Sequence, residues 1–295
     1  MRFNKVAVLK GGDSAEREVS LRSGAAIADG LRKKGYDVVE IDMPDRQLVL
    51  PADTDAVFIA LHGAFGEDGG VQKELEARGI PYTGSGPESS RKAFDKSISK
   101  GIFMAEGIPT PTYEILKQSE KRTLSLPVVA KPVRQGSSVG VHRVFHEENW
   151  LPAFADVLQY GDEVLVESYI SGTELTIGVV GDRVLPVLEI RAPEGYYDYR
   201  AKYSSGLTEY LVPAPVSDHT AKCCRELAFR AFKALGCSGM ARVDFRLRED
   251  GALYVLEVNT IPGFTETSLL PKAARAVGID FPDLCDMVLR LAMGK

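Results

Sequence analysis

Apolar residues in the first part of the chain form short blocks that alternate with helix-like patterns. Residues 5–9 are an apolar run, followed by a glycine turn and then by apolar residues at helical spacing as far as Gly35. Further apolar runs at residues 36–41 and 56–61 continue the series. Strands that alternate with helices predict a parallel sheet with helices on its faces. We therefore expect the chain to open with an α/β domain.

A different pattern near the C-terminus predicts a β-hairpin. Residues 240–247 and 253–260 are rich in Val, Leu, Phe and Tyr, and between them stands Asp250-Gly251. This dipeptide is the one that a two-residue type I′ turn prefers. If these two residues form the loop, the register of the two strands follows by counting outward from the turn.

That register places Asp244 directly opposite Glu257 and Arg242 opposite Asn259. Side chains two positions apart on a strand point to the same side of the sheet, so all four share one face. Opposed carboxylates at roughly 5 Å repel by about 3 kcal/mol at an effective dielectric of about 20. A favourable cross-strand pair contributes only about 0.2–1 kcal/mol. We therefore expect a cation between the two acidic side chains.

Two carboxylates and an amide oxygen are a ligand set that suits Mg²⁺ bound together with a nucleotide. The alternative is a solvated hairpin whose outer face is charged. The sequence after the hairpin favours the ligand site, because Pro262 and Gly263 introduce a polar loop whose backbone can approach a ligand closely.

Two polar residues follow predicted parallel strands at the edge where open α/β sheets bind ligands. Glu16 comes after the first strand and His62 after the third. The alternatives are a helix-capping acid and a loop histidine with no contact to a ligand. The segment 62–70 contains four glycines, and we expect it to line a pocket. The Gly11-Gly12 turn lacks the GxGxxG spacing, so it does not indicate a dinucleotide site.

The middle of the chain contains a possible phosphate-binding loop. An apolar strand ends at Lys131, and Ser137 and Ser138 then stand between Gly136 and Gly140. Backbone N–H groups and hydroxyls of such a loop can donate to phosphate oxygens, with the lysine supplying charge. The GxxxxGK[ST] pattern is absent, and the alternative is an ordinary turn.

Two further segments look suited to binding a nucleotide. Glu167 and Glu174 flank a short connector and either accept hydrogen bonds from an adenine amino group and a ribose or are solvated. Residues 195–206 are aromatic, basic and bounded by glycines, without a helical or strand period. This composition predicts a lid loop.

Composition limits the classes of protein that fit. A chain of 295 residues with 44% hydrophobic content has room for two or three domains. The net charge of −5 argues against a general nucleic-acid binder or a membrane-surface protein. The four cysteines show no CxxC spacing, and no apolar run reaches the ~18 residues of a membrane span. We expect a cytoplasmic protein with reduced thiols.

Taken in order, the motifs resemble those of the D-alanine:D-alanine ligases of the ATP-grasp superfamily. They are GGDSAEREVS, ALHG with GEDG, YTGSG, KPVRQGSSVG, YYDYRAKY, RVDF and EVNTIPGFTETSLL, which together cover essentially the full length. The resemblance implies an α/β ATP-grasp fold with an N-terminal Rossmann-like parallel domain and two α+β subdomains that clasp ATP. The implied boundaries are 1–86 for the substrate-binding domain, 87–170 for the central subdomain and 171–295 for the catalytic subdomain.

The resemblance also implies a reaction. ATP would drive the ligation of two D-alanine molecules through an acylphosphate, for peptidoglycan precursor synthesis, with two Mg²⁺ (or Mn²⁺) ions as cofactors. The implied nucleotide-binding residues are Lys96, Lys131, Ser138, Glu167, Ile170, Glu174 and Lys202, and the metal ligands are Asp244, Glu257 and Asn259. The implied catalytic groups are Glu16, Ser137, Tyr203, Arg242 and Gly263, and D-alanine would contact His62, Ser268 and Leu269. A homodimer that binds neither nucleic acid nor membrane is also implied.

Some positions depart from the family pattern, and two other functions stay open. The departures are Lys10, Phe94, Gln135, Ile261 and Glu266. One rival function is another ATP-grasp carboxylate–amine ligase or a ligase that joins D-alanine to D-lactate. The other is a non-catalytic ATP-binding module, which should lack some of the polar hairpin residues. All four are present, which favours an enzyme.

Overall fold

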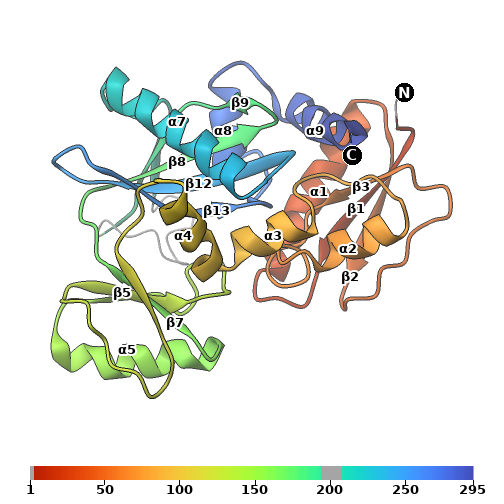
Figure 1. The fold of residues 1–295 in the computed structure, drawn as a ribbon. Coiled ribbons are helices and arrows are strands. Elements are labelled where there is room, and N and C mark those ends of the chain that lie inside the picture. The colour runs from red at the N-terminus through yellow and green to blue at the C-terminus, as the bar shows by residue number, and fades with distance from the viewer. Residues whose placement is uncertain (1–2, 194–207, 295) are drawn as a thin grey trace.

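The structure is a computed structural model that describes residues 3–193 and 208–294. Within these ranges the strands form three sheets, which are arranged side by side with helices packed on them (Figure 1). The mixed α/β architecture agrees with the predicted fold class. Within the same ranges, no helix combines the length and the apolar content that crossing a membrane requires.

The N-terminal sheet is parallel, as the alternating pattern predicts. It has the strand order β2–β1–β3 and consists of β1 (Lys5–Gly11), β2 (Asp37–Met43) and β3 (Ala56–Ile59). Alternate residues of the central strand β1 belong to two different cores, since Val6 and Val8 pack with one cluster and Ala7 and Leu9 with the other. Helices α1 (Arg17–Lys33) and α2 (Gly70–Ala77) each contribute to one of these cores.

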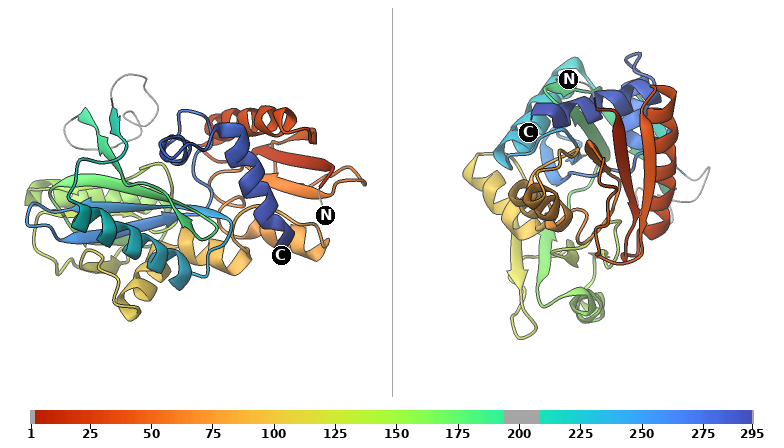
Figure 2. Two further views of the ribbon diagram at one scale, coloured as in Figure 1. Left: turned by 90° about the horizontal axis from the view of Figure 1, so that it is seen from above. Right: turned by 90° about the vertical axis from the view of Figure 1, so that its right-hand side faces the viewer.

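The central part of the chain forms an antiparallel sheet in a separate lobe (Figures 1 and 2). Its strand order is β4–β7–β5–β6, and its strands are β4 (Tyr113–Leu116), β5 (Val128–Pro132), β6 (His142–Val144) and β7 (Val164–Ser168). Helix α5 (Trp150–Val157), between the short 3₁₀ turns η1 (Glu147–Asn149) and η2 (Leu158–Tyr160), covers one face. Helices α3 (Pro87–Phe94) and α4 (Lys96–Ala105) connect this lobe to the N-terminal sheet.

The third sheet carries the predicted hairpin. Its path is β11–β10–β8–β12–β13, and β9 pairs with β8. The strands are β8 (Thr173–Val180), β9 (Arg183–Val184), β10 (Leu188–Arg191), β11 (Glu209–Leu211), β12 (Met240–Leu247) and β13 (Leu253–Asn259). Helix α7 (Asp218–Ala234) packs on this sheet, and Ser217 caps it, because its Oγ accepts a hydrogen bond from the Thr220 N–H at 3.1 Å. All four cysteines are free thiols.

The hairpin has the predicted register at its polar end but not the predicted turn. The loop contains residues 249–251, because the Arg248 N–H donates to the Ala252 carbonyl and the Gly251 N–H donates to the Arg248 carbonyl. Gly251 has φ +88°, which suits the three-residue loops that end in a left-handed glycine. The predicted two-residue turn is therefore wrong, and the longer loop shifts the pairing of the two strands by one residue. A bulge at Leu256 shifts the pairing back by one residue. Asp244 consequently lies opposite Glu257, as predicted.

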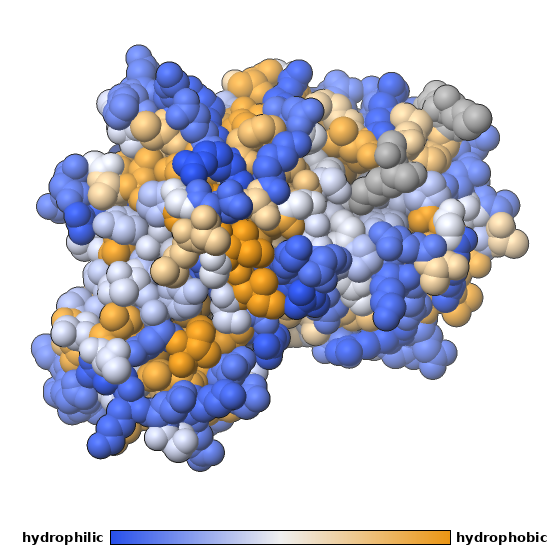
Figure 3. Space-filling model, viewed as in Figure 1, coloured by the Kyte–Doolittle hydropathy of each residue, from blue (hydrophilic) through white to orange (hydrophobic). Residues whose placement is uncertain are grey.

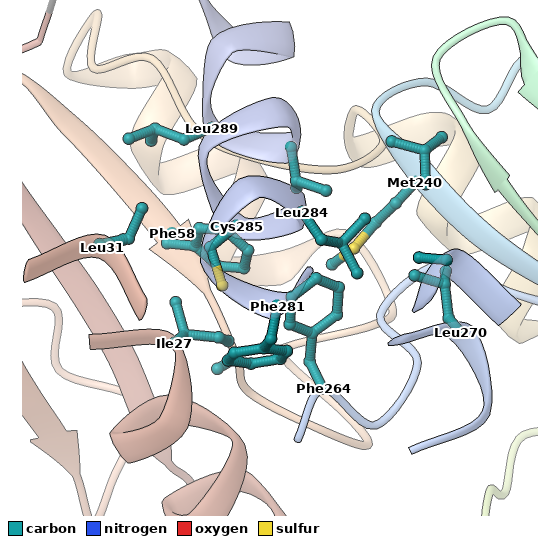
Figure 4. Packing of buried hydrophobic residues seen from close by; sticks show 14 of the residues in the cluster. Ile27, Leu31, Phe58, Met240, Phe264, Leu270, Phe281, Leu284, Cys285 and Leu289 are labelled. Atoms are coloured by element: carbon teal, nitrogen blue, oxygen red, sulfur yellow. The ribbon is translucent and has the colours of Figure 1, made fainter. Parts of the chain in front are cut away.

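The C-terminal residues pack back against the N-terminal sheet. Helix α8 (Leu269–Arg275) is followed by α9 (Phe281–Arg290) and the short turn η4 (Leu291–Gly294). Figure 4 shows Phe281 and Leu284 of α9 pointing into one core with Ile27 of α1 and Phe58 of β3. The Tyr36 hydroxyl donates to Asp286 at 2.5 Å in the same region. The three sheets lie within the segments 1–86, 87–170 and 171–295, whose boundaries stay a prediction.

The surface seen in Figure 3 is mostly hydrophilic. Hydrophobic side chains gather in smaller areas, one of them over the lobe that contains β5, β7 and α5.

Candidate functional site

Two adjoining cavities lie where the sheets approach one another. The larger has a volume of about 620 Å³ and is lined by the start of α1, the loop before β6, the polar face of the hairpin and the loop before α8. The smaller, of about 120 Å³, lies between the central sheet and the hairpin. Lys96, Gln135, Gly136, Arg242 and Glu257 line both cavities. A molecule in one cavity would therefore be close to a molecule in the other.

Cations already balance the opposed acids of the hairpin. The Arg242 guanidinium binds Asp244 through two hydrogen bonds, each of 2.8 Å, and Thr176 donates to the same carboxylate at 2.6 Å. The Lys96 ammonium lies 3.5 Å from a Glu257 oxygen. The repulsion expected from the sequence is thus offset by one arginine on the same strand and one lysine at the start of α4.

The hairpin offers oxygen ligands on one face, as a hard metal ion requires. No group of three or more His, Cys, Asp and Glu side chains is arranged to hold a metal within the part of the chain that the structure describes. The predicted set instead combines the carboxylates of Asp244 and Glu257 with the amide of Asn259, and two of these, Glu257 and Asn259, line the larger cavity. This set fits Mg²⁺, which usually takes one or two carboxylates and completes its shell with water and phosphate oxygens.

The Gly-Ser loop and the start of α1 meet across the larger cavity. The Ser137 hydroxyl donates to a carboxylate oxygen of Glu16, so the structure brings together two residues far apart in sequence. A Cβ added at Gly136 would lie 2.8 Å from the other Glu16 oxygen. Ser137 and Ser138 both have positive φ, at 51° and 59°, a conformation that few non-glycine residues adopt. The contact with Glu16 and this backbone conformation favour a ligand-binding loop over an ordinary turn, and its phosphate contacts stay a prediction.

A cluster of buried charges lies at the smaller cavity. The Glu167 carboxylate is 2% exposed and contacts two ammonium groups, that of Lys131 at 2.5 Å and that of Lys100. Burial opposes the ionisation of Glu167, yet the two lysines together lower its pKa. Burial also lowers the pKa of Lys100, to about 8. No sequence motif singled out Lys100, although its position one helical turn after Lys96 places both lysines on one side of α4.

The other predicted nucleotide-binding residues line the same cavity. Lys96, Lys131, Ser138, Glu167, Ile170 and Glu174 are all on its wall. Arg246, which no sequence motif singled out, also lines this cavity. It lies 3.0 Å from Glu174 and donates to the Gly172 carbonyl at 3.1 Å. Lys202 and Tyr203, with the rest of the predicted lid at residues 195–206, fall in segment 194–207 outside the described residues.

The glycine-rich loop after β3 contributes an acidic side chain that the sequence analysis missed. Glu67, rather than His62, lines the larger cavity. Burial raises the pKa of Glu67 well above its usual value, and the neighbouring Glu16 raises it further. His62 is 4% exposed, and burial lowers its pKa, so its ring is neutral at neutral pH. The loop therefore lines a pocket as expected, while the substrate contact of His62 stays a prediction.

The loop before α8 forms the far wall of the larger cavity. Gly263, Ser268 and Leu269 are on this wall. The next residue after the glycine, Phe264, packs between Phe58 and Phe281, and its N–H donates to Ser23 of α1 at 3.2 Å. The core of Figure 4, which includes Phe264, therefore holds this loop in place.

Comparison with known proteins identifies relatives over nearly the whole chain. Two family descriptions match, "D-ala D-ala ligase C-terminus" at residues 102–290 and "D-ala D-ala ligase N-terminus" at residues 44–85. The D-alanine–D-alanine ligase of Methylacidiphilum infernorum is 45% identical over 287 residues, covering 97% of this chain and 95% of its own. That of Syntrophotalea carbinolica is 46% identical over 294 residues, covering 98% and 96%.

Solved structures agree with these relatives. The D-alanine–D-alanine ligase of Bacillus anthracis complexed with ATP superimposes with a TM-score of 0.88 at 34% identity, covering 99% of this chain and 98% of its own. The VanG D-Ala:D-Ser ligase of Enterococcus faecalis has a TM-score of 0.87 at 29% identity, covering 99% and 100%.

Proposed function

The chain belongs to the D-alanine–D-alanine ligase family, and we propose that it joins two D-alanine molecules into D-alanyl-D-alanine with ATP. One structural observation supports this above all: two adjoining cavities share the polar hairpin face, one lined by Lys131, Glu167 and Glu174 and the other by Glu16, Ser268 and Leu269. The products would be ADP, phosphate and the dipeptide used in peptidoglycan precursor synthesis. We place this reaction in the cytoplasm, where ATP is available.

The chemistry follows from the stability of a carboxylate. An amine does not displace oxygen from it, so the γ-phosphoryl group of ATP is first transferred to a carboxylate oxygen of the first D-alanine and ADP leaves. The amine of the second D-alanine then attacks the carbonyl carbon of this acylphosphate, loses a proton, and the C–O bond breaks to release phosphate. Phosphoryl transfer of this kind depends mainly on positioning and charge neutralisation.

The residues on the cavity walls suit these steps. Glu16, oriented by Ser137, would bind the ammonium of the first D-alanine. Arg242 and the backbone N–H of Gly263 would stabilise the negative oxygen of the tetrahedral intermediate, since donors fixed in a low-dielectric site act strongly on developing charge. Ser268 and Leu269 would bind the carboxylate of the second D-alanine.

On the nucleotide side, Lys96, Lys131 and Ser138 would contact the phosphates of ATP, and Glu167, Ile170 and Glu174 would contact adenine and ribose. Asp244, Glu257 and Asn259 would hold two Mg²⁺ (or Mn²⁺) ions, which neutralise phosphate charge when they are bound. The proposed substrates are thus all small molecules.

The proposal is tested by measuring ATP-dependent phosphate release with a panel of acceptors. The panel contains D-alanine alone, other D- and L-amino acids including D-serine, and D-lactate with D-alanine. We expect release with D-alanine alone, and mass spectrometry should identify the dipeptide. Release that needs D-lactate or D-serine as the acceptor would overturn the substrate assignment, and no release with any acceptor would overturn the activity.

Replacement of Lys131 by alanine should weaken ATP binding by about tenfold or more. The mutation removes a charge together with its hydrogen bonds to phosphate, and charge-assisted hydrogen bonds are the strong ones. Calorimetric titration with ATP measures the effect, and Lys121→Ala at an exposed position of the same lobe is the matched control. An affinity equal to that of the control variant would contradict a phosphate contact for Lys131.

A further inference from the structure

We propose that Lys100 is a positioning residue for nucleotide binding: its buried ammonium neutralises Glu167 and leaves the charge of Lys131 available to the phosphates. The inference rests on the proposed binding of ATP in the smaller cavity. Among the described residues, Lys131 and Glu167 line that cavity, whereas Lys100 does not line it and is fully buried. Lys100 would therefore act on a nucleotide only through its neighbours.

The ammonium of Lys100 is held from three sides. It contacts one oxygen of Glu167, donates to the Thr110 hydroxyl at 2.7 Å and lies 5.6 Å from the centre of the Tyr113 ring. The Thr110 hydroxyl in turn donates to the Val255 carbonyl at 2.8 Å, next to the bulge of the hairpin. Because the hydroxyl proton is used in that bond, Thr110 accepts from Lys100. These partners fix the ammonium against Glu167.

The charges of the cluster explain why a second lysine is needed. Glu167 uses its two oxygens separately, one for Lys100 and the other for Lys131 at 2.5 Å. Two lysines and one carboxylate leave one positive charge at the edge of the cavity. Without Lys100, Glu167 and Lys131 would form a neutral pair, and Lys131 would attract phosphate far less strongly. Charges in such a buried place interact more strongly than they do in water.

A purely structural role for Lys100 makes a different prediction. If the side chain only fills space beneath α4, its loss should weaken the binding of every ligand of this cavity alike. If it frees the charge of Lys131, its loss should weaken the binding of ligands that have phosphates and spare those that have none. ADP and adenosine differ in this respect alone, so the ratio of their affinities separates the two roles.

The experiment measures ADP and adenosine binding by calorimetry for the wild type, three variants of the cluster and one control variant. Lys100→Met keeps the length of the side chain and removes its charge, and it should lower the ADP-to-adenosine affinity ratio by about tenfold or more. Lys100→Met combined with Glu167→Gln restores the cluster to one positive charge and should return the ratio to near the wild-type value. Glu167→Gln alone leaves two positive charges and should raise the ratio. Lys92→Met, at a surface pair with Glu88 on α3, is the control.

Each outcome decides the matter. The inference is supported if the ADP-to-adenosine affinity ratio is highest in Glu167→Gln, intermediate in the wild type and the double variant, and lowest in Lys100→Met. The inference is overturned if Lys100→Met loses ADP and adenosine affinity equally. It is also overturned if the affinity ratio of the double variant is as low as that of Lys100→Met. If Lys100→Met does not fold, the comparison of the double variant with Glu167→Gln and the wild type still gives the predicted order or contradicts it. Failure of the wild type to bind ADP would instead contradict the proposed function.

Discussion

Replacement of Glu257 by glutamine is expected to lower ATP-dependent phosphate release by about 100-fold or more. Glutamine keeps the size of the side chain but removes the charge that lies opposite Asp244 and 3.5 Å from Lys96. Loss of a residue that only supports a metal ligand already costs about 10–100-fold in metal affinity or activity. Loss of a proposed ligand shared by both cavities should cost at least as much.

The same substitution should leave the thermal midpoint of unfolding nearly unchanged, because it removes the repulsion from Asp244 and the attraction of Lys96 together. Steady-state phosphate release at saturating Mg²⁺, ATP and D-alanine measures the effect. Glu249→Gln, an exposed glutamate in the loop of the same hairpin, is the matched control and should retain full activity. Turnover in Glu257→Gln close to that of this control would remove Glu257 from the metal site.

The hairpin shows how far local pattern carries a prediction. The alternation of apolar and polar residues in β12 and β13 was sufficient to place the polar residues on one face, and Asp250-Gly251 correctly indicated a turn. The type of turn and the bulge at Leu256 were not predictable, because both depend on how the strand packs against its neighbours. The turn and the bulge each shift the strand pairing by one residue, in opposite directions. Asp244 therefore lies opposite Glu257 as predicted, although the predicted turn was wrong.

The contacts between distant segments were beyond what the residues alone could indicate. Composition placed Glu167 at the end of a strand and left open whether it was solvated. Its burial between two lysines depends on antiparallel pairing of β5 with β7 and on the packing of α4. The contact of Glu16 with Ser137 likewise joins two lobes, and no local pattern indicates it. Such contacts depend on tertiary structure, which the local periodicity of apolar and polar residues does not determine.

Replacement of Arg242 by lysine is expected to lower kcat by about 10²–10³-fold, which is typical for the loss of a group that stabilises a developing oxyanion. The arginine uses two of its N–H groups on Asp244, each at 2.8 Å, and this planar fork fixes the orientation of a guanidinium that lines both cavities. Lysine keeps the positive charge between the carboxylates but has no such fork, so it cannot hold Asp244 and donate to an oxyanion in the same geometry.

Because lysine keeps the charge, this variant separates geometry from electrostatic balance. Its thermal midpoint and its affinity for ATP should stay close to the wild-type values, while kcat falls. Arg248→Lys is the matched control, since Arg248 forms the same kind of pair with Asp250 on the same hairpin but at the exposed turn. Single-turnover measurements of dipeptide formation, combined with calorimetric ATP binding, test this expectation. If Arg242→Lys loses ATP affinity and stability as strongly as activity, Arg242 acts as a structural counter-charge to Asp244. If kcat alone falls, its guanidinium acts on the reacting atoms.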